Sequence, residues 1–574
     1  MGHTFVEKIL NATTGSLVYR EPDIVLCHDN SARIQGLFKK AGGKNIQNPD
    51  KLFVVLDRKQ TGQVEELIRD YNAIRDFMHE QKVERFFDCD SGICHEVLAS
   101  HLRPGMTITG SDSHTCTAGA FNCFAVGLNK TETARLWKTG KIWFRVPETV
   151  KITLKGRLRS GVYAKDIALW VMGMLREEFV EYKAIEYHGE GVRQLSIADR
   201  MCIANVSEEM GVKNSVFPPD DTLADYFGDV AVRGVWADED AVYYKEFTVD
   251  LNEVMPLVLF THQHNEVKSV DECKELEIQQ GLIGACSNGR MDDLRIVAHV
   301  LKNKRIHPGF QLFVVPASRE IYLQAREEGL IDTIIKSGAS VLGASCGPCL
   351  GSSHMINADA KRFISTTNSH SMRRLSDMGV EKYVASPATV AMTALTGKLT
   401  AEMDYKGEKY RYWNLPVTQP EVSPFEKRKF SNVWNYSDKN YISCKQLFPE
   451  ELTHKISLED GAAILPHILE EFDPEFARHV SKGDIIIAGE SFGVGRLIKH
   501  SVVGLIEAGI KAILVKSASR SFFRMALNLG LPVYIAPEIV DLYKDGSAII
   551  IDIEDNRIFV DDREFLLNIG DKIV

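Results

Sequence analysis

The chain has 574 residues, too many for one hydrophobic core, so three or four domains are expected. Hydrophobic residues make up 44% and charged residues 25%, which is typical of a soluble globular protein. A net charge of −10 and a pI near 6.0 argue against nonspecific binding to nucleic acid or acidic membranes. The first residues lack a secretory apolar core and no apolar stretch approaches a bilayer span, so a cytoplasmic location is expected.

Strand and helix patterns alternate along the first 400 residues. In chain order they are a strand at 51–57, a helix at 63–81, a strand and loop at 106–112, an amphipathic helix at 164–179, a strand, turn and helix at 281–301, a strand at 311–318, and a further repeat of the alternation at 333–351. This alternation predicts an α/β fold with parallel sheets and helices on their faces. Sites in such sheets lie beyond the carboxyl ends of the strands.

A change in composition and periodicity divides the chain. Residues 403–440 are aromatic, charged and proline-bearing without clear periodicity, which is typical of a linker, and we place the main boundary near residue 425. A second α/β unit follows. Its predicted parts are a strand and glycine-rich loop at 483–495, a helix from about 499, a strand, helix and strand at 511–535, and a β-rich segment at 547–567.

A short polar cluster stands out at the end of the predicted strand in "TITGSDSHTCTAGAFNCFAVG" (107–127). Asp112, Ser113 and His114 follow the β-branched run directly. Short polar side chains held there by a rigid element and facing a crevice suit a functional site. The alternative interpretation is an ordinary helix cap with a hydrogen-bonded histidine.

The cysteines point to a metal centre. Eleven are too few and odd in number for a disulfide scaffold, and most, such as Cys202 and Cys273, are expected to be small buried hydrophobes. Cys346 and Cys349 form a Cys-x-x-Cys pair, and Cys286 lies in a strand-to-loop turn about 60 residues earlier. A zinc site would need a fourth ligand, and a thioredoxin-type pair belongs to a smaller unit. Three thiolates on glycine-rich turns favour a [4Fe–4S] cluster with one iron open to act as a Lewis acid.

Several motifs together resemble the aconitase superfamily: "GSDSHTCTAGAFNCFAVG", "LIGACSN", "SCGPCLG", "NSVFP" and "GESFGVG…GIKAILVKSASRSFFRMALNLGLP". Within it the chain is most similar to the isopropylmalate/homoaconitate dehydratase branch, with large and small subunits fused. The resemblance implies a large part (1–425) of three α/β domains around an iron–sulfur cluster, and a swivelling C-terminal α/β domain (426–574). It also implies a [4Fe–4S]-dependent hydro-lyase that reversibly dehydrates a hydroxy carboxylate.

The same resemblance assigns residues to the site. The implied catalytic residues are Asp57, His95, Asp112, Ser113, His114 and Glu209; the implied substrate-binding residues are His28, Asn205 and Arg374; and the implied cluster ligands are Cys286, Cys346 and Cys349. The enzyme would take a small anionic hydroxy acid, with no nucleic acid or membrane partner.

Two departures from the family pattern lie in the large part. The Asp-His pair of the resembled enzymes reads Asp57–Arg58 here, and an arginine cannot usefully donate a proton near neutral pH. The run "NSHSMRR" keeps Arg374, but Ser369 replaces one arginine.

The third departure lies in the small-domain loop. The family motif Gly-x-Gly-Ser-Ser-Arg-x-His reads "GVGRLIKH" at 493–500, with Arg496 at the base serine and Ile498 at the arginine that binds a substrate carboxylate. We expect Arg496 to bind the anion, and Lys499, desolvated beside Leu497 and Ile498 when the C-terminal domain closes, to act as the base. The alternative interpretation of Arg496 and Lys499 is a solvated basic loop.

Three hypotheses remain at this stage. The first is a hydro-lyase with specificity different from citrate or isopropylmalate. The second is a non-catalytic iron–sulfur sensor that binds a partner or RNA; the missing serine favours it, and the acidic net charge disfavours it. The third, a zinc or redox protein, needs a fourth ligand that the sequence does not show.

Overall fold

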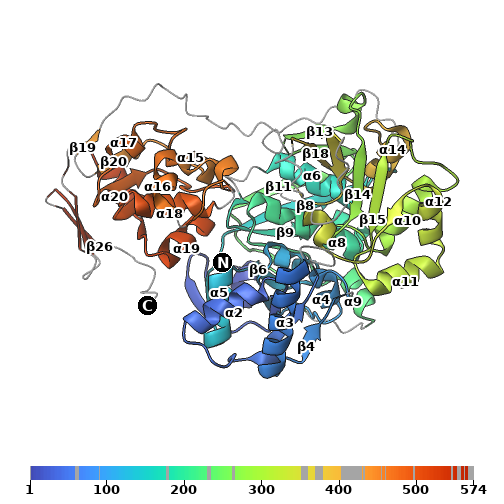
Figure 1. Cartoon of the computed structure of the whole chain (residues 1–574), viewed down its shortest axis with the longest axis horizontal. Coiled ribbons are helices and arrows are strands. Elements are labelled where there is room, and N and C mark those ends of the chain that lie inside the picture. The colour runs from blue at the N-terminus through green and yellow to red at the C-terminus, as the bar shows by residue number, and fades with distance from the viewer. Residues whose placement is uncertain are drawn as a thin grey trace. The chain divides into compact units, whose positions relative to one another are not determined.

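The protein divides into two compact units (Figure 1). Unit 1 comprises Met1–Arg176 and Lys183–Trp413, and unit 2 comprises Glu177–Tyr182 and Asn414–Val574. The computed structural model describes residues 2–57, 64–89, 91–175, 180–228, 234–261, 266–350, 360–368, 379–402, 429–430, 433–453, 455–458, 460–495, 498–544, 547, 549–552, 557–561 and 563–566. The boundary predicted near 425 falls in 403–428, outside these residues.

The first sheet of unit 1 is parallel, with the order β4-β3-β2-β5-β6. Its strands are β2 (Ile24–Cys27), β3 (Leu52–Val55), β4 (Arg85–Phe87), β5 (Thr107–Gly110) and β6 (Phe124–Gly127), with helices α2 (Ser31–Lys40), α3 (Val64–Glu80), α4 (Cys94–Ala99) and α5 (Lys130–Thr139). The strand predicted at 51–57 and the helix at 63–81 are confirmed. The chain order reverses between β2 and β5, which creates a crevice at their carboxyl ends.

The second sheet of unit 1 is also parallel, with the order β10-β9-β8-β11. Its elements are β8 (Thr149–Lys155), α6 (Ala164–Met174), β9 (Ala184–His188), α8 (Ile197–Val206), the 3-10 turn η4 (Ser207–Met210), β10 (Asn214–Val216), α9 (Asp221–Phe227) and β11 (Lys245–Asp250). The prediction that 164–179 is amphipathic was wrong. Helix α6 ends at Met174 and is buried on nearly every side, including Lys165 and Asp166, because it lies between layers.

The third sheet of unit 1 has the order β13-β12-β18-β17-β14-β15-β16 and is mixed, since β12 runs antiparallel to both of its neighbours. Its elements are β12 (Leu257–Phe260), β13 (Glu266–Ser269), β14 (Gln280–Gly284), α10 (Met291–Leu301), β15 (Gln311–Val315), α11 (Arg319–Glu327), α12 (Leu330–Lys336), β16 (Ser340–Val341), β17 (Arg362–Ser365), β18 (Glu381–Ala385) and α14 (Pro387–Thr396). The strand, turn and helix predicted at 281–301 are therefore confirmed.

Unit 2 is built on a five-stranded sheet with the order β19-β20-β21-β22-β23, parallel from β20 onward. Its elements include β19 (Lys429–Phe430), β20 (Val433–Tyr436), β21 (Ile485–Ala488), α18 (Lys499–Glu507), β22 (Ala512–Val515), α19 (Arg520–Asn528) and β23 (Val533–Ile535). A three-stranded antiparallel sheet of β24 (Ile549–Asp552), β25 (Arg557–Val560) and β26 (Arg563–Leu566) follows. The predicted α/β unit and its β-rich end are confirmed.

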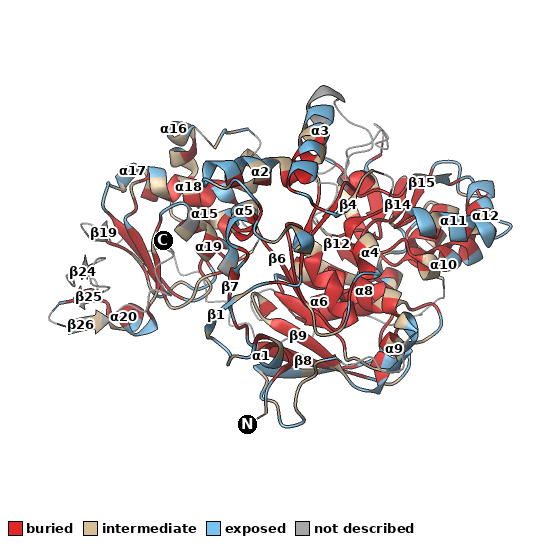
Figure 2. Cartoon of the chain, turned by 90° about the horizontal axis from the view of Figure 1, so that it is seen from below, coloured by how far each residue is buried: buried red, intermediate tan, exposed pale blue. Residues whose placement is uncertain are grey.

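Burial follows the layered architecture, since the sheets and the inward faces of the helices are buried (Figure 2). One of the charged side chains in this interior forms a bidentate ion pair. Arg200 of α8 is fully buried, and its guanidinium donates to both carboxylate oxygens of Asp220 at 2.8 and 2.6 Å. Asp220 in turn caps α9 by accepting from the Leu223 N–H, so the pair ties two helices together. None of the helices in the described segments is both long and apolar enough to cross a bilayer.

We predict that Arg200→Met destabilises unit 1 by about 2–3 kcal/mol, because it leaves the Asp220 carboxylate without its bidentate partner. The matched control is Arg295→Met, which removes a bidentate pair with Glu328 that is exposed to solvent. That change should cost no more than about 0.5 kcal/mol. Urea unfolding monitored by circular dichroism compares the two, and equal losses would contradict the role assigned to the buried pair.

Candidate active site

The crevice between β2 and β5 holds the first group of predicted site residues. His28 follows β2 directly, and Asp112 follows β5 after one intervening serine. Both side chains are buried, and His28 Nε2 lies 3.6 Å from Asp112 Oδ2. The topological reversal of the sheet therefore brings together two residues that are 84 positions apart in the sequence.

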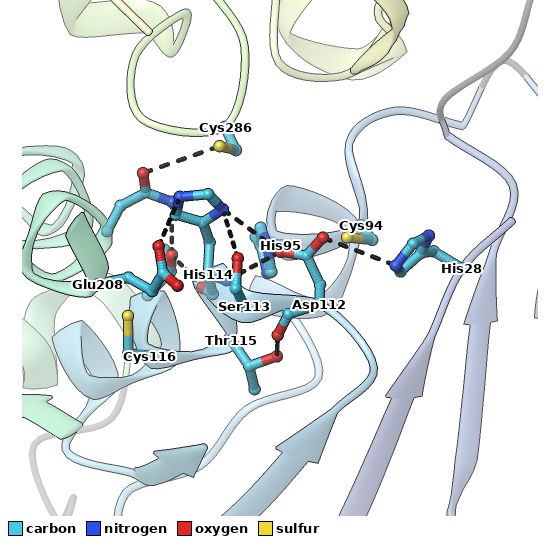
Figure 3. A network of polar contacts seen from close by, with 12 residues as sticks. His28, Cys94, His95, Asp112, Ser113, His114, Thr115, Cys116, Glu208 and Cys286 are labelled. Atoms are coloured by element: carbon cyan, nitrogen blue, oxygen red, sulfur yellow. Dashed lines mark hydrogen bonds and ion pairs between the residues drawn. The ribbon is translucent and has the colours of Figure 1, made fainter. Parts of the chain in front are cut away.

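Asp112 is the centre of this polar network (Figure 3). Its Oδ1 accepts from the backbone N–H of His114 at 2.9 Å, which caps the 3-10 helix η2 (Ser113–Phe121). The same oxygen lies 3.1 Å from Nε2 of His95, which α4 supplies. The capping interpretation of the Asp-Ser-His cluster is thus confirmed, and the site interpretation stays a prediction. Ser113 is exposed, with its Oγ 3.5 Å from His114 Nδ1.

His114 lies among acidic groups from another segment. Its Nε2 is 3.4 Å from Glu209 Oε1 and 3.5 Å from Glu208 Oε2, both on η4. The side-chain amide of Asn368 approaches the same nitrogen to 2.7 Å. Burial alone would lower the pKa of His114, but the sulfur of Cys286 and three nearby carboxylates raise it well above its usual value. These neighbours therefore favour the protonated form of the imidazole.

Asn205 connects this polar group to the cysteines. Its Nδ2 donates to Thr117 Oγ1 at 2.8 Å, and its Oδ1 accepts from Asn368 Nδ2 at 2.9 Å. The Cys286 thiol lies 3.7 Å from the same oxygen. Asn205 is fully buried, so each of these bonds is made in the absence of competing solvent.

The three predicted cluster cysteines meet at one place. Cys286, Cys346 and Cys349 pack together with Ile93 and Ala285 in a single buried cluster. None of the cysteines in the described part of the chain is in a disulfide. Burial raises the pKa of the Cys286 thiol, against a smaller opposing effect of His114.

The other two cysteines named from the sequence lie apart from that cluster. Cys202 is buried as expected, with its thiol 3.7 Å from the side-chain oxygen of Asn288, whereas Cys273 is only half-buried.

The turn that carries Cys286 depends on glycine. Gly284 has φ +133°, and a Cβ there would lie 2.1 Å from the carbonyl oxygen of Val315. Ala285 adopts φ 63°, an uncommon left-handed conformation for a residue with a side chain. The Arg290 guanidinium holds the turn from within by donating to the carbonyl of Cys286 at 2.9 Å. It also forms a 2.9 Å ion pair with Glu96 on α4.

Asp57 fixes the Cys-x-x-Cys turn from the end of β3. Its main-chain carbonyl accepts from the N–H of Cys346 at 2.8 Å and from the hydroxyl of Ser345 at 2.9 Å. Its carboxylate accepts from the N–H of Cys94 at 2.9 Å, at the beginning of α4. The structure therefore places Asp57 as a brace between three segments. Its sequence neighbour Arg58 lies outside the described residues.

The structure describes Ile498 and Lys499 of the small-domain loop of unit 2. Ile498 is buried in the core of unit 2, and Lys499, the first residue of α18, is exposed. Within unit 2 by itself the two neighbouring side chains thus lie in different environments, and the desolvation of Lys499 stays a prediction. Leu497 and Arg496 lie outside the described residues, as do Ser369 and Arg374 of unit 1.

Four residues of the site were missed by sequence reasoning. They are Glu208 beside His114, Asn368 between His114 and Asn205, Ser345 beside Asp57, and Arg290 behind Cys286. Three of them had a local signal, since Asn368 begins the run "NSHSMRR" and Ser345 and Arg290 adjoin the cysteine motifs. Glu208 had only its neighbour Glu209.

Comparison with known proteins gives the family. The model of the aconitase family (aconitate hydratase) matches residues 4–274 and 261–397. A 3-isopropylmalate dehydratase large subunit from Methanopyrus kandleri is 38% identical over 417 residues, covering 71% of this chain and 100% of that protein. A probable methanogen homoaconitase large subunit from Methanosarcina mazei is 36% identical, covering 66% of this chain and 97% of that protein.

A solved 3-isopropylmalate dehydratase from Methanocaldococcus jannaschii is 27% identical, with a TM-score of 0.21, covering 24% of this chain and 78% of that one. Among the three hypotheses, the family match and the relatives support the enzyme. The chain belongs to the aconitase family and is a hydro-lyase.

Proposed function

We propose that this hydro-lyase depends on a [4Fe–4S] cluster and dehydrates a hydroxy carboxylate other than citrate or isopropylmalate. The observation that carries the proposal is the meeting of Cys286, Cys346 and Cys349 in one buried cluster, although they come from two turns about 60 residues apart. Three soft thiol donors on braced turns fit an iron–sulfur cluster with one iron not held by protein thiolate. When bound, such a cluster supplies a Lewis-acidic iron for the hydroxyl of the substrate.

The polar residues beside the thiols fit the handling of the departing hydroxyl. His114 carries a favoured proton and lies beside Cys286, so it would donate that proton as the carbon–oxygen bond breaks. Asp112 would hold His114 in position through the backbone hydrogen bond, and would orient His95 by the 3.1 Å contact. His28, whose Nε2 lies 3.6 Å from Asp112 Oδ2, would help to hold the Asp112 carboxylate in position.

Basic side chains are the proposed binding partners of the substrate carboxylates, and one of them is the proposed base. Arg374 and Arg496 would bind carboxylates of the substrate. Lys499 of unit 2 would accept the proton removed from carbon in its neutral form, which requires that water be excluded from it during the reaction. The alternative bases in unit 1 are Asp57, Asp112 and Glu209. They are less suited, because the first two already accept backbone N–H groups and Glu209 lies 3.4 Å from His114 Nε2. The buried Ile498 cannot bind a carboxylate, which supports a substrate different from those of the resembled enzymes.

We predict that anaerobic reconstitution loads about four iron and four labile sulfide ions per chain. Replacing Cys286, Cys346 or Cys349 by serine should lower that content severely, because each thiolate would hold one iron. Metal and sulfide analysis with electron paramagnetic resonance of the reduced protein checks this.

Cys202→Ser is the matched control for this experiment. Cys202 is equally buried and lies near the same turn, but it is not in the three-thiol cluster, so its loss should leave the iron content unchanged. Zinc at full occupancy without labile sulfide would contradict the proposal.

A second prediction concerns specificity. The reconstituted enzyme should turn over citrate and 3-isopropylmalate at least about a thousandfold more slowly than the usual enzymatic range of roughly 1–1000 per second. The physical reason is the loss of the loop serine and of the carboxylate-binding arginine. For the true substrate, Arg496→Ala should mainly raise KM and Lys499→Ala should mainly lower kcat. Full turnover of citrate or 3-isopropylmalate is the result that would refute the altered specificity.

A further inference from the structure

A cleft of about 370 Å³ opens in unit 1 between Met255, the 3-10 turn η5 (Val270–Cys273) and residues 396–401, which follow α14. We propose that this cleft, the α14 cleft, binds a small amphipathic monoanion, a monocarboxylate with a short apolar body. The inference concerns a site separate from the active site. It does not depend on an iron–sulfur cluster or on the identity of the substrate.

The α14 cleft lies at the opposite end of β14 from the cysteines. The N–H of Leu399 donates to the carbonyl of Leu276 at 2.9 Å, so the segment after α14 lies beside the residues that lead into β14. Cys286 follows the carboxyl end of that strand, after Gly284. Five strand residues span roughly 16 Å. The cleft and the cysteine turn are therefore two separate places in the same unit.

Most of the wall of the α14 cleft is apolar. The apolar lining residues are Met255, Pro256, Val270, Leu399 and Ala401. Val270 and Leu399 are buried members of the hydrophobic core behind the cleft, which fixes their side chains. A mainly apolar wall and a volume within roughly 300–1,000 Å³ are typical of sites that bind small molecules.

Backbone hydrogen bonds give the α14 cleft a preformed shape. The N–H of Val270 donates to the carbonyl of Pro256 at 3.0 Å, which joins two sides of the cleft. On the third side, the N–H of Thr400 donates to the hydroxyl of Thr393 on α14 at 3.2 Å. A ligand that enters a preformed cleft does not have to order these segments, which lowers the cost of binding.

The charge of the lining favours an anion. Among the described residues that line the cleft, Lys274, Lys398 and Asp271 are charged, which gives one net positive charge. Lys398 Nζ pairs with Glu275 at 2.7 Å, and these side chains are 46% and 89% exposed. An ion pair that is so exposed contributes little to stability, and an ammonium has three N–H donors. An acidic head group can therefore bind Lys398 beside Glu275 or in its place.

The combination of an apolar wall and ammonium groups selects the class of ligand. A second carboxylate on the ligand would lie against Met255 and Val270 without a partner, which is costly, and a cation would face two ammonium groups. The volume of the cleft corresponds to roughly a dozen water molecules. A monocarboxylate of about five to eight carbons is therefore of suitable size.

The test is saturation-transfer difference NMR on the full-length protein with hexanoate, hexylammonium and 1-hexanol, which share one apolar chain. Hexanoate should bind at least about tenfold more tightly than hexylammonium. Lys274→Gln combined with Lys398→Gln should lower the hexanoate affinity at least about tenfold, because the lining then keeps only the charge of Asp271. Ala401→Trp should abolish binding by filling the cleft.

Lys336→Gln is the matched control, since Lys336 is an exposed lysine of α12 that does not line the cleft, and it should bind hexanoate like the parent chain. Circular dichroism melting of each variant checks folding. The partly exposed Ala401 and the exposed lysines are chosen because their replacement should leave the core intact.

Equal binding of the three probes, or no binding of hexanoate at tens of millimolar, would overturn the inference. So would binding that Arg374→Ala removes and the double lysine variant retains, because hexanoate would then occupy the active site. A dimer that Ala401→Trp dissociates would also overturn it, since a second chain would then fill the cleft. The iron and sulfide content of the same preparations bears only on the proposed function, so the two failures are distinguishable.

Discussion

The site depends on the way one residue at the end of a strand holds two other segments. Asp57 uses its main-chain carbonyl for the Cys346 turn and its carboxylate for the start of α4. These hydrogen bonds are buried, where an unmade bond costs about 1–3 kcal/mol, so the three segments are fixed together. Because α4 also supplies His95 and Glu96, the same brace sets the distance between the polar crevice and the cysteines.

The three sheets of unit 1 contribute side chains of different chemical types to the site. The first sheet, through its reversal between β2 and β5, supplies charged and imidazole groups, while the turns of the third sheet supply thiols. The second sheet provides α8 and η4, whose Asn205 and Glu209 lie between them. The side chains of the site therefore come from elements of three different sheets.

Much of this arrangement could be predicted from the sequence. Apolar runs of four to seven residues located the strands, and the glycine-rich surroundings of Cys286, Cys346 and Cys349 indicated that the thiols meet. Glu208 could not be predicted, because its role depends on the packing of η4 against η2 and not on any spacing in the chain. The burial of α6 could not be predicted for the same reason, because local periodicity does not show that a second layer covers its other face. The loop motif likewise does not show that the side chain of Ile498 lies in the core of unit 2.

The central claim is that three thiols of this chain hold a four-iron cluster with one iron free of protein thiolate. The most direct measurement is the Mössbauer spectrum of the full-length protein reconstituted anaerobically with iron-57. The account predicts two components in a ratio of about three to one, the minor one with a larger isomer shift from oxygen or nitrogen ligation. Four equivalent sulfur-bound irons, or a single mononuclear iron without sulfide, would contradict it.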